Sequence, residues 1–336
     1  MKISENYSLL KHNTFGLDIK TRWFVEYENE TDLQRLISDE YFFSQPFIHI
    51  GQGSNLLFLG DYPGVVVHSL IQGIEIVREE ENHIWIKAGA GVNWDSFVAR
   101  CVEKGWGGIE NLSRIPGEVG ASAVQNIGAY GVEVCDSITE VHTYNIVTGE
   151  KQIFRNEDCK FAYRHSIFKE DTYKGKYFIT YVIYRLSRQP EYHLEYGNLK
   201  TVLDGKQIDL KTIRDTVMAI RETKLPDPKE FGNAGSFFMN PYVCAEHYED
   251  LQKKHSDIPA YPVNEKVVKI PAAWLIDQCG LKGKVIGRAA IHEKQPLVII
   301  NKGGATADDI ASLASLVCEV VKEKFNIELQ KEVLFI

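Results

Sequence analysis

The segment from Ile115 to Gly131 constrains this chain more than any other stretch, because it combines four glycines, two side-chain amides and a serine between apolar residues. Glycine reaches backbone conformations that are closed to other residues and lets another group approach the main chain closely. A purely structural loop rarely needs so many permissive residues beside so many uncharged hydrogen-bonding groups. We therefore expect a backbone wrapped around a large polar ligand, and no regular helix, between Gly105 and Gly131.

A second glycine-rich turn, Gly51-Gln-Gly-Ser-Asn55, follows the apolar run 47–50. Backbone N–H groups in such a turn can converge on an anion. The next residues predict another strand, and a third glycine and a Lys-Ser/Thr pair are missing, which excludes the Rossmann fingerprint and the P-loop. A plain hairpin turn stays open for this motif alone. Two such loops, about sixty residues apart, predict one extended ligand with a pyrophosphate in its middle.

The hydrophobic patterns predict a mixture of strands and separate helices, hence an α+β protein. The expected strands are 47–50, 55–59, 65–67, 84–86, 141–144, 177–184 and 192–195. The expected helices begin at the N-cap Asn93 and end at Gly105, run from Leu210 to Glu222, and begin at the capping box Thr306-Ala-Asp-Asp309. A Lys-rich stretch, 198–212, predicts a domain boundary, since 336 residues suffice for two or three domains.

Charge and composition disfavour several classes of function. The net charge of -8 argues against charge-driven nucleic-acid binding, because no basic excess can neutralise phosphates. The N-terminus has no apolar signal core, and no run approaches the roughly 18 apolar residues of a membrane span, so we expect a cytoplasmic protein without membrane contact. Six scattered cysteines and ten dispersed histidines show no metal-ligand spacing. Buried free thiols and no metal are therefore expected.

Two cationic motifs are candidates for binding an anion. Arg164 and Lys169 lie among aromatic residues, where a charge is costly unless an anion pairs with it. A surface ion pair explains that motif equally well. Arg221 and Lys224 lie at the end of the expected helix before a Pro-forced stop. Interaction with the helix dipole explains these two as well as a ligand does.

Two further residues are candidates for proton chemistry. Ser236 lies in Gly232-Asn-Ala-Gly-Ser-Phe-Phe238, between small residues and two phenylalanines. The string is no Gly-x-Ser-x-Gly elbow and has no His–Asp partner set nearby, which disfavours acyl transfer, but such a hydroxyl can protonate a very basic carbanion. Glu332 falls in the apolar C-terminal run 329–336, where a solvent-facing residue on an edge strand is the simpler interpretation.

Taken together, these motifs resemble the MurB family of UDP-N-acetylenolpyruvoylglucosamine reductases. The resemblance runs nearly end to end in the same motif order, and three strings carry it: Gln125-Asn-Ile-Gly-Ala-Tyr-Gly131, Gly232-Asn-Ala-Gly-Ser-Phe-Phe238 and Trp274-Leu-Ile-Asp-Gln-Cys279. It implies a two-lobed FAD-binding fold of the vanillyl-alcohol-oxidase (PCMH) type plus a C-terminal α+β substrate-binding domain. The implied domains are 1–70, 71–200 and 201–336, with the FAD-binding region at about 16–187.

The resemblance also implies roles for individual residues. The implied FAD-binding residues are Gly51, Gly53, Ser54, Asn55, Gly117, Gly120, Ser122, Gln125, Ile127 and Gly131. The implied catalytic residues are Arg164, Ser236 as proton donor, and Glu332. The implied substrate-binding residues are Tyr196, Arg221, Lys224, Asn240 and Gln295, and the Tyr196-Gly loop is similar to that of the type I branch. Met239 and Arg288 depart from the family pattern, which affects the expected diphosphate contacts.

The implied activity is that of an oxidoreductase of peptidoglycan synthesis, in which NADPH, through non-covalently bound FAD, reduces UDP-N-acetylglucosamine enolpyruvate to UDP-N-acetylmuramate. A monomer is expected. One alternative is another flavin oxidase of this fold; many attach FAD through His or Cys, and neither residue occurs in 51–55 or 115–131. A second alternative is a non-catalytic nucleotide-sugar sensor, which needs no set of Arg164, Ser236 and Glu332.

Overall fold

A computed structural model describes residues 1–336, which divide into two compact units. The first unit comprises 1–7, 21–52 and 62–223, and the second comprises 8–20, 53–61 and 224–336. The expected boundary stretch 198–212 lies inside the first unit. The three domains that the resemblance implies stay a prediction, because the division into compact units is coarser. No helix is both long and apolar enough to cross a membrane.

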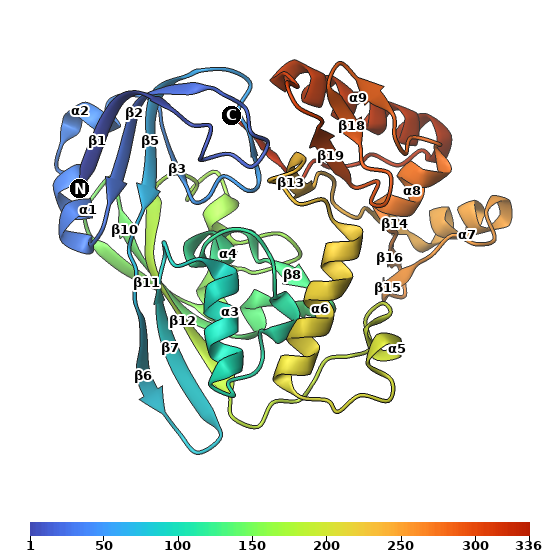
Figure 1. Ribbon diagram of the computed structural model, residues 1–336, viewed down its shortest axis with the longest axis horizontal. Helices are drawn as coiled ribbons and strands as arrows, with labels where there is room; N and C mark the ends of the chain where they lie inside the picture. Colours follow the sequence, from blue (N-terminus) through green and yellow to red (C-terminus); the bar gives the residue numbers. More distant parts are fainter. The chain divides into compact units, whose positions relative to one another are not determined.

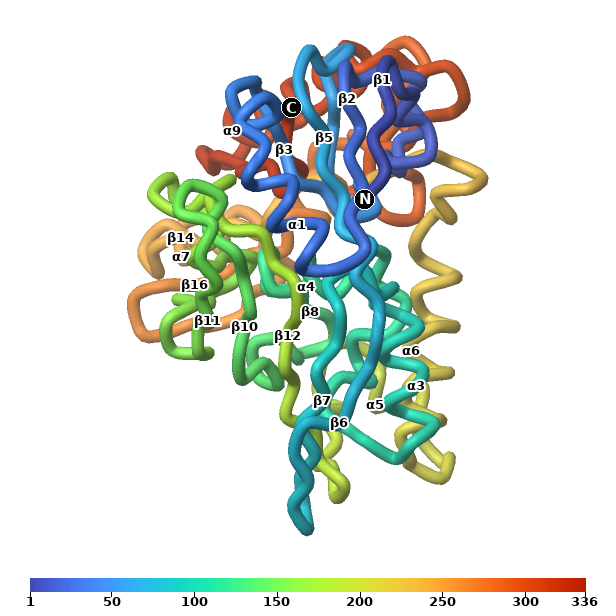
Figure 2. The backbone as a smooth tube through the Cα atoms, turned by 90° about the vertical axis from the view of Figure 1, so that its left-hand side faces the viewer, coloured from blue at the N-terminus to red at the C-terminus, as the bar shows by residue number.

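The first unit contains two sheets (Figure 1). The strands of the smaller sheet lie in the order β1 (Lys2–Ser8), β2 (Lys20–Tyr27), β5 (Tyr62–Ser69), β3 (Phe47–Ile50), with β5 parallel to both β2 and β3. The strands of the larger, antiparallel sheet lie in the order β11 (Lys151–Arg155), β10 (Ile138–Asn145), β12 (Tyr177–Ser187), β7 (His83–Gly89), β6 (Ile74–Glu79). Figure 2 shows these five strands running next to one another.

Helices and short turns complete the first unit. The helices are α1 (Glu30–Ile37), α2 (Glu40–Phe43), α3 (Trp94–Glu103), α4 (Val119–Gln125), α5 (Leu199–Leu203) and α6 (Leu210–Lys224). The 3₁₀ turns are η1 (Glu110–Leu112), η2 (Val134–Asp136), η3 (Asn156–Cys159) and η4 (Ile167–Lys169), and a hairpin is formed by β8 (Gly128–Ala129) and β9 (Val132–Glu133). Buried residues of α3 and α4 form one hydrophobic core with β7, β10 and β12.

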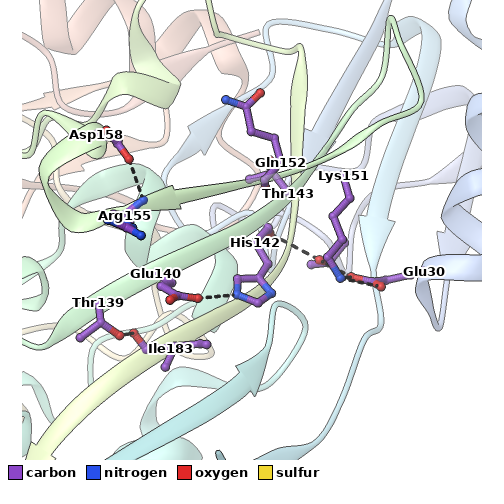
Figure 3. Close-up of polar contacts among 11 residues, drawn as sticks. Glu30, Thr139, Glu140, His142, Thr143, Lys151, Gln152, Arg155, Asp158 and Ile183 are labelled. Carbon is purple, nitrogen blue, oxygen red and sulfur yellow. Dashed lines mark hydrogen bonds and ion pairs between the residues drawn. The ribbon is translucent and has the colours of Figure 1, made fainter.

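Polar contacts join α1 to the larger sheet on the face drawn in Figure 3. The Glu30 carboxylate accepts from Lys151 Nζ of β11 (2.8 Å) and from Thr180 Oγ1 of β12 (3.0 Å). On β10, His142 Nε2 lies 2.9 Å from Glu140 Oε2. The charge of Lys151 and the hydrogen bonds lower the pKa of Glu30 despite the opposing effect of burial. These residues lie outside the glycine-rich segments 51–55 and 115–131.

The second unit contains two antiparallel sheets and a parallel pair. The strands of the first sheet lie in the order β13 (Gly232–Ser236), β19 (Val298–Asn301), β18 (Ala289–Ile291), β17 (Val285–Ile286). Those of the second lie in the order β14 (Tyr242–Cys244), β16 (Val267–Lys269), β15 (Tyr261–Asn264), and β20 (Leu334–Phe335) pairs with β4 (Leu56–Leu57). The helices are α7 (Ala245–Lys254), α8 (Ala272–Gln278) and α9 (Ala307–Phe325), and α9 packs against the first sheet.

Local signals predicted several elements well. Asn93 caps α3 by accepting from the Ser96 N–H (3.0 Å), and the capping box of Thr306 and Asp309 starts α9. Three predictions were wrong: α4 is a regular helix inside the stretch 105–131, residues 192–195 form no strand, and the C-terminal strand begins only at Leu334.

The thiol prediction was partly wrong. All six cysteines are unpaired, but only Cys101 and Cys159 are buried, and Cys244 is exposed.

Candidate active site

The two glycine-rich loops meet at the start of α4. The Gly117 N–H donates to Gln52 Oε1 (3.1 Å), which ties the second loop to the turn that follows β3. A Cβ on Gly51 would lie 3.0 Å from Oε2 of Glu118 and 3.6 Å from the Ala121 Cβ. A side chain at position 51 would therefore crowd the Glu118 carboxylate, which would have to move aside.

Glu118 and His68 form a buried pair beneath this junction. His68 Nε2 lies 3.0 Å from Oε1 of Glu118, and His68 Nδ1 lies 3.6 Å from Oε1 of Glu26. Burial alone would lower the pKa of His68, but the hydrogen bond and charge of Glu118, together with Glu26, raise it above the usual value. Burial also raises the pKa of Glu118, although the hydrogen bond and charge of His68 oppose this, so the two groups hold a proton between them more tightly than either group would in water.

Helix α4 is fixed by contacts of its first turn. The N–H groups of Val119 and Gly120 donate to the carbonyls of Val92 and Ala90, both at 2.9 Å. A Cβ on Gly120 would approach the Ala90 Cβ to 2.9 Å. Ser122 Oγ donates to the Val119 carbonyl (2.7 Å) and lies 3.0 Å from the hydroxyl of Tyr184. Gly120 and Ser122 thus have packing roles, and their contact with a cofactor stays a prediction.

Residues 53–55 belong to the second unit. Gly53 has a φ of +69°, and a Cβ there would lie 1.9 Å from the His12 carbonyl oxygen, so only glycine fits. Ser54 is half-buried. The Asn55 amide donates to the Glu332 carbonyl (3.1 Å), and the Asn55 carbonyl accepts from the Leu334 N–H (3.0 Å). The Asn55 side chain, expected at a pyrophosphate, thus binds the C-terminal segment.

Arg164 lies at the tip of a tight turn with a φ of +55°. Its Nη2 donates to the Gly128 carbonyl (2.9 Å), and its guanidinium carbon lies 5.1 Å from the centre of the Tyr163 ring. Its own carbonyl accepts from Lys169 Nζ (2.8 Å), and Lys169 also donates to Gln125 Oε1 (3.1 Å). A non-glycine residue in the left-handed region is strained, which is common at functional sites.

The stretch from Gln125 to Gly131 is held in place by main-chain hydrogen bonds and by close packing at its last residue. The Ile127 N–H donates to the Ser122 carbonyl (3.2 Å), and the Ile127 carbonyl accepts from the Val134 N–H (2.8 Å). A Cβ on Gly131 would lie 3.2 Å from the Tyr196 Cβ. These contacts bring Gly131 and Tyr196, two of the predicted site residues, together.

Ser236 follows a β-bulge in β13. Strand β13 pairs with β19 at Asn233 and again at Ser236, with a shift of register between them. The Asn233 carboxamide oxygen accepts from the Gly235 N–H (3.0 Å), and Gly235 has a φ of +70°. Bulges redirect side chains and are common next to active sites. Asn233 is buried and holds this bulge, a role that the sequence did not reveal.

A short ladder pairs the main chain at Glu332 with the residues that follow Ser236. Residues 237–239 pair with residues 330–332, and the Glu332 N–H donates to the Phe237 carbonyl (2.8 Å). Glu332 is half-buried and is therefore not the solvent-facing edge residue that the sequence alone favoured. The structure thus unites two of the three predicted catalytic residues within one unit.

The predicted substrate-binding residues differ in their surroundings. Burial lowers the pKa of Arg221, and its buried Nε has no hydrogen-bond partner. Tyr196 and Lys224 are exposed. Asn240 Oδ1 accepts from the Ala272 N–H (2.9 Å) at the start of α8, so its side chain has a structural contact. The Gln295 N–H donates to Nδ1 of His292 (3.2 Å) in the turn before β19.

At Met239 and Arg288, the two positions expected to depart from the family pattern, the main-chain N–H makes a hydrogen bond. The Met239 N–H donates to the Gln330 carbonyl (2.9 Å), and the Arg288 N–H donates to Asp309 Oδ2 (3.2 Å). Arg288 is exposed.

The loop geometry fits a bound dinucleotide. The turns at Gly51 and Gly117 meet through the hydrogen bond from the Gly117 N–H to Gln52, and Gly117 has a φ of +124° that favours glycine. Apart from the His68–Glu118 pair, the polar side chains in the second loop are uncharged amides and hydroxyls, which can hold a pyrophosphate by their dipoles. His68 and Glu118 were missed as members of this region. The signal was available for Glu118, because it is the only charged residue between Ile115 and Gly131.

Comparison with known proteins agrees with this geometry. Residues 21–154 match an FAD-binding domain, and residues 227–336 match the C-terminal domain of UDP-N-acetylenolpyruvoylglucosamine reductase. The reductase of that name from Porphyromonas gingivalis is 49% identical, and the alignment covers 100% of both chains. The one from Bacteroides fragilis is 50% identical over 99% of this chain and 100% of the relative.

A solved structure confirms the fold. The UDP-N-acetylenolpyruvylglucosamine reductase from Thermus caldophilus is 23% identical, with a TM-score of 0.69 over 100% of this chain and 99% of the other. The expected α+β fold, an FAD-binding fold of the vanillyl-alcohol-oxidase type with a C-terminal α+β domain, is therefore correct. This chain belongs to the UDP-N-acetylenolpyruvoylglucosamine reductase (MurB) family.

Proposed function

We propose that this protein reduces UDP-N-acetylglucosamine enolpyruvate to UDP-N-acetylmuramate in the cytoplasm, with NADPH as hydride donor and non-covalent FAD as carrier. The structural observation that supports this is the ladder between 237–239 and 330–332, which pairs the main chain at Glu332 with Phe237, the residue that follows Ser236 at the end of the bulged strand. Family membership supports the substrate, and the match of residues 21–154 to an FAD-binding domain supports the cofactor.

In this proposal the glycine-rich loops at 51–55 and 117–131 hold FAD, which, once NADPH has reduced it, would supply a hydride to the terminal alkene carbon of the enolpyruvyl ether. The Arg164 guanidinium stabilises the negative charge that develops toward the substrate carboxylate, and Glu332 assists through a shared proton. Ser236 Oγ then donates its proton to the neighbouring carbon, giving the lactyl ether. A hydroxyl is a sufficient acid there only because the carbanion is more basic.

The remaining roles concern binding. Tyr196, Arg221, Lys224, Asn240 and Gln295 are proposed to bind the uridine diphosphate part of the substrate. For Arg221 the support is physical, since a half-buried arginine whose Nε is buried without a hydrogen-bond partner suits an anionic ligand. A monomer is the proposed state in solution.

The activity can be tested with the purified protein in the absence of oxygen. We expect NADPH to bleach a flavin absorbance band and the enolpyruvyl nucleotide sugar to restore it, with product heavier than the sugar by two hydrogens. A flavin band that the sugar does not restore contradicts the proposed substrate. Acid precipitation tests the attachment: we expect FAD in the supernatant, and colour retained in the pellet contradicts non-covalent binding.

A further inference from the structure

The segment that carries Tyr196 has no regular secondary structure of its own. It joins β12, which ends at Ser187, to α5, which begins at Leu199, and Tyr196 itself is exposed. An exposed side chain on an irregular segment costs conformational entropy when a ligand orders it. Contacts that hold the segment beforehand therefore reduce the cost of binding.

Asn111 provides such a contact. Its side chain is only 1% exposed, and its amide nitrogen donates both hydrogens to main-chain carbonyls. One hydrogen bond goes to Tyr130 (3.0 Å) and the other to His193 (2.7 Å). The Oδ1 atom of Asn111 is buried without a hydrogen-bond partner. The reversed amide would set that oxygen against two carbonyl oxygens, so the two carbonyls fix the orientation of the side chain.

Asn111 lies in a 3₁₀ turn that buried hydrogen bonds hold on both sides. It belongs to η1 (Glu110–Leu112), whose Leu112 carbonyl accepts from Nε1 of the buried Trp94 (2.9 Å). The carboxylate of Glu110, also buried, accepts from the Gly108 N–H (2.7 Å). The amide that binds the Tyr196 segment thus projects from a turn that is anchored on both sides.

The hairpin tip between β8 and β9 makes a second contact with the same segment. Tyr130 and Gly131 at the tip have φ values of +49° and +81°, as a two-residue hairpin turn requires. The missing Cβ of Gly131 leaves room for Tyr196, whose Cβ would be 3.2 Å away. Asn111 binds this tip through the Tyr130 carbonyl and the Tyr196 segment through the His193 carbonyl, so the three parts form one unit.

We infer that Asn111 is a positioning residue for substrate binding: it fastens the segment 189–198 to the hairpin tip and so holds Tyr196 ready for the nucleotide sugar. This inference rests on the proposed function and adds a residue that does not itself contact substrate. Because Asn111 acts through Tyr196, it affects the binding of the sugar and not the reduction of FAD by NADPH.

The test is a double-mutant cycle of Asn111→Ala and Tyr196→Ala, with steady-state and half-reaction kinetics. Loss of two buried hydrogen bonds predicts that Asn111→Ala raises KM for the enolpyruvyl sugar about tenfold, while kcat and the rate of flavin reduction by NADPH change less than about twofold. In the Tyr196→Ala background the same substitution is expected to raise KM no further, because the two residues act as one unit. Additive effects on KM, or an equal loss in flavin reduction, would overturn the inference.

Hydrogen exchange provides a readout that does not depend on the reaction. Asn111→Ala is expected to speed amide exchange in the segment 189–198 but not in α3. Unchanged exchange in the segment 189–198 would refute the positioning role of Asn111, even if the protein reduced no sugar at all. Gly131→Ala tests the same segment if Asn111→Ala folds poorly. It leaves the Asn111 side chain unchanged but crowds Tyr196 and strains the hairpin tip, so it is also expected to raise KM for the sugar, and an unchanged KM counts against the inference.

Discussion

The Nε2 atom of His68 lies 3.0 Å from Oε1 of Glu118, and both side chains are more than nine-tenths buried where the two glycine-rich loops meet. Because Gly51 adjoins Glu118, this pair connects β5, the turn after β3 and the start of α4. The pair is therefore a structural support for the proposed cofactor loops, with a charge state that depends on pH.

The raised pKa of His68 predicts a pH-dependent stability. The folded protein holds this proton more tightly than the unfolded chain, so the contribution is fully present below pH 6.5 and is lost as pH rises through the raised folded pKa. Over that window the free energy of unfolding of the wild type should fall by up to about 1.4 kcal/mol per pH unit relative to His68→Gln. Denaturant unfolding at several pH values measures this slope. The matched control is His165→Gln, at a 40% exposed histidine, which should keep the wild-type slope.

His49 predicts the opposite dependence at lower pH. Burial, with the charge of His68, lowers the pKa of His49 to about 3. The imidazole is therefore neutral and stacks on Phe178 with ring centres 4.3 Å apart. Stability from this group is present above pH 6.5 and is lost as pH falls toward the folded pKa, at about 1.4 kcal/mol per pH unit. His49→Gln should show a shallower loss between pH 6.5 and 5, and an unchanged slope would mean that His49 is protonated in the folded protein.

Arg164→Lys should reduce turnover by at least about tenfold, because lysine keeps the charge but loses the planar fork that holds a carboxylate or enolate at two points. FAD content should stay normal. Lys160→Arg is a suitable control, since Lys160 also has a left-handed backbone (φ +46°) but its side chain is 58% exposed. Near-normal turnover of Arg164→Lys would assign Arg164 a structural role, such as its hydrogen bond to the Gly128 carbonyl.

Ser236→Ala should separate the two half-reactions. The variant is expected to bind FAD and to be bleached by NADPH at nearly the normal rate, because that step needs no proton from Ser236. Reoxidation by the enolpyruvyl sugar should slow by at least about a hundredfold, and Ser236→Cys, which keeps a proton to donate, should recover part of the loss. Stopped-flow absorbance follows each half-reaction. Equal slowing of both would make Ser236 a packing residue of the bulge.

Elements with local signals could be predicted from the sequence. The Asn93 cap, the capping box at Thr306 and the apolar spacing of α6 each act within a few residues, so the printed order of residues suffices. The glycines of the two loops also pointed to close backbone approach. The three motif strings predicted the family, and the end-to-end similarity to known reductases confirms that prediction.

The tertiary structure decided what those residues contact. Asn55 and Glu332 are far apart in sequence, yet the Asn55 amide binds the Glu332 carbonyl, and the Glu118 carboxylate fills the space beside Gly51. Asn111 fastens the Tyr196 segment through carbonyls that no sequence pattern marks. A glycine allows a ligand or another part of the same chain to approach closely, and the sequence does not distinguish the two. The role of a buried amide or carboxylate is known only from the partner groups that it binds. Those partners come from distant strands and turns, so only the fold could assign them.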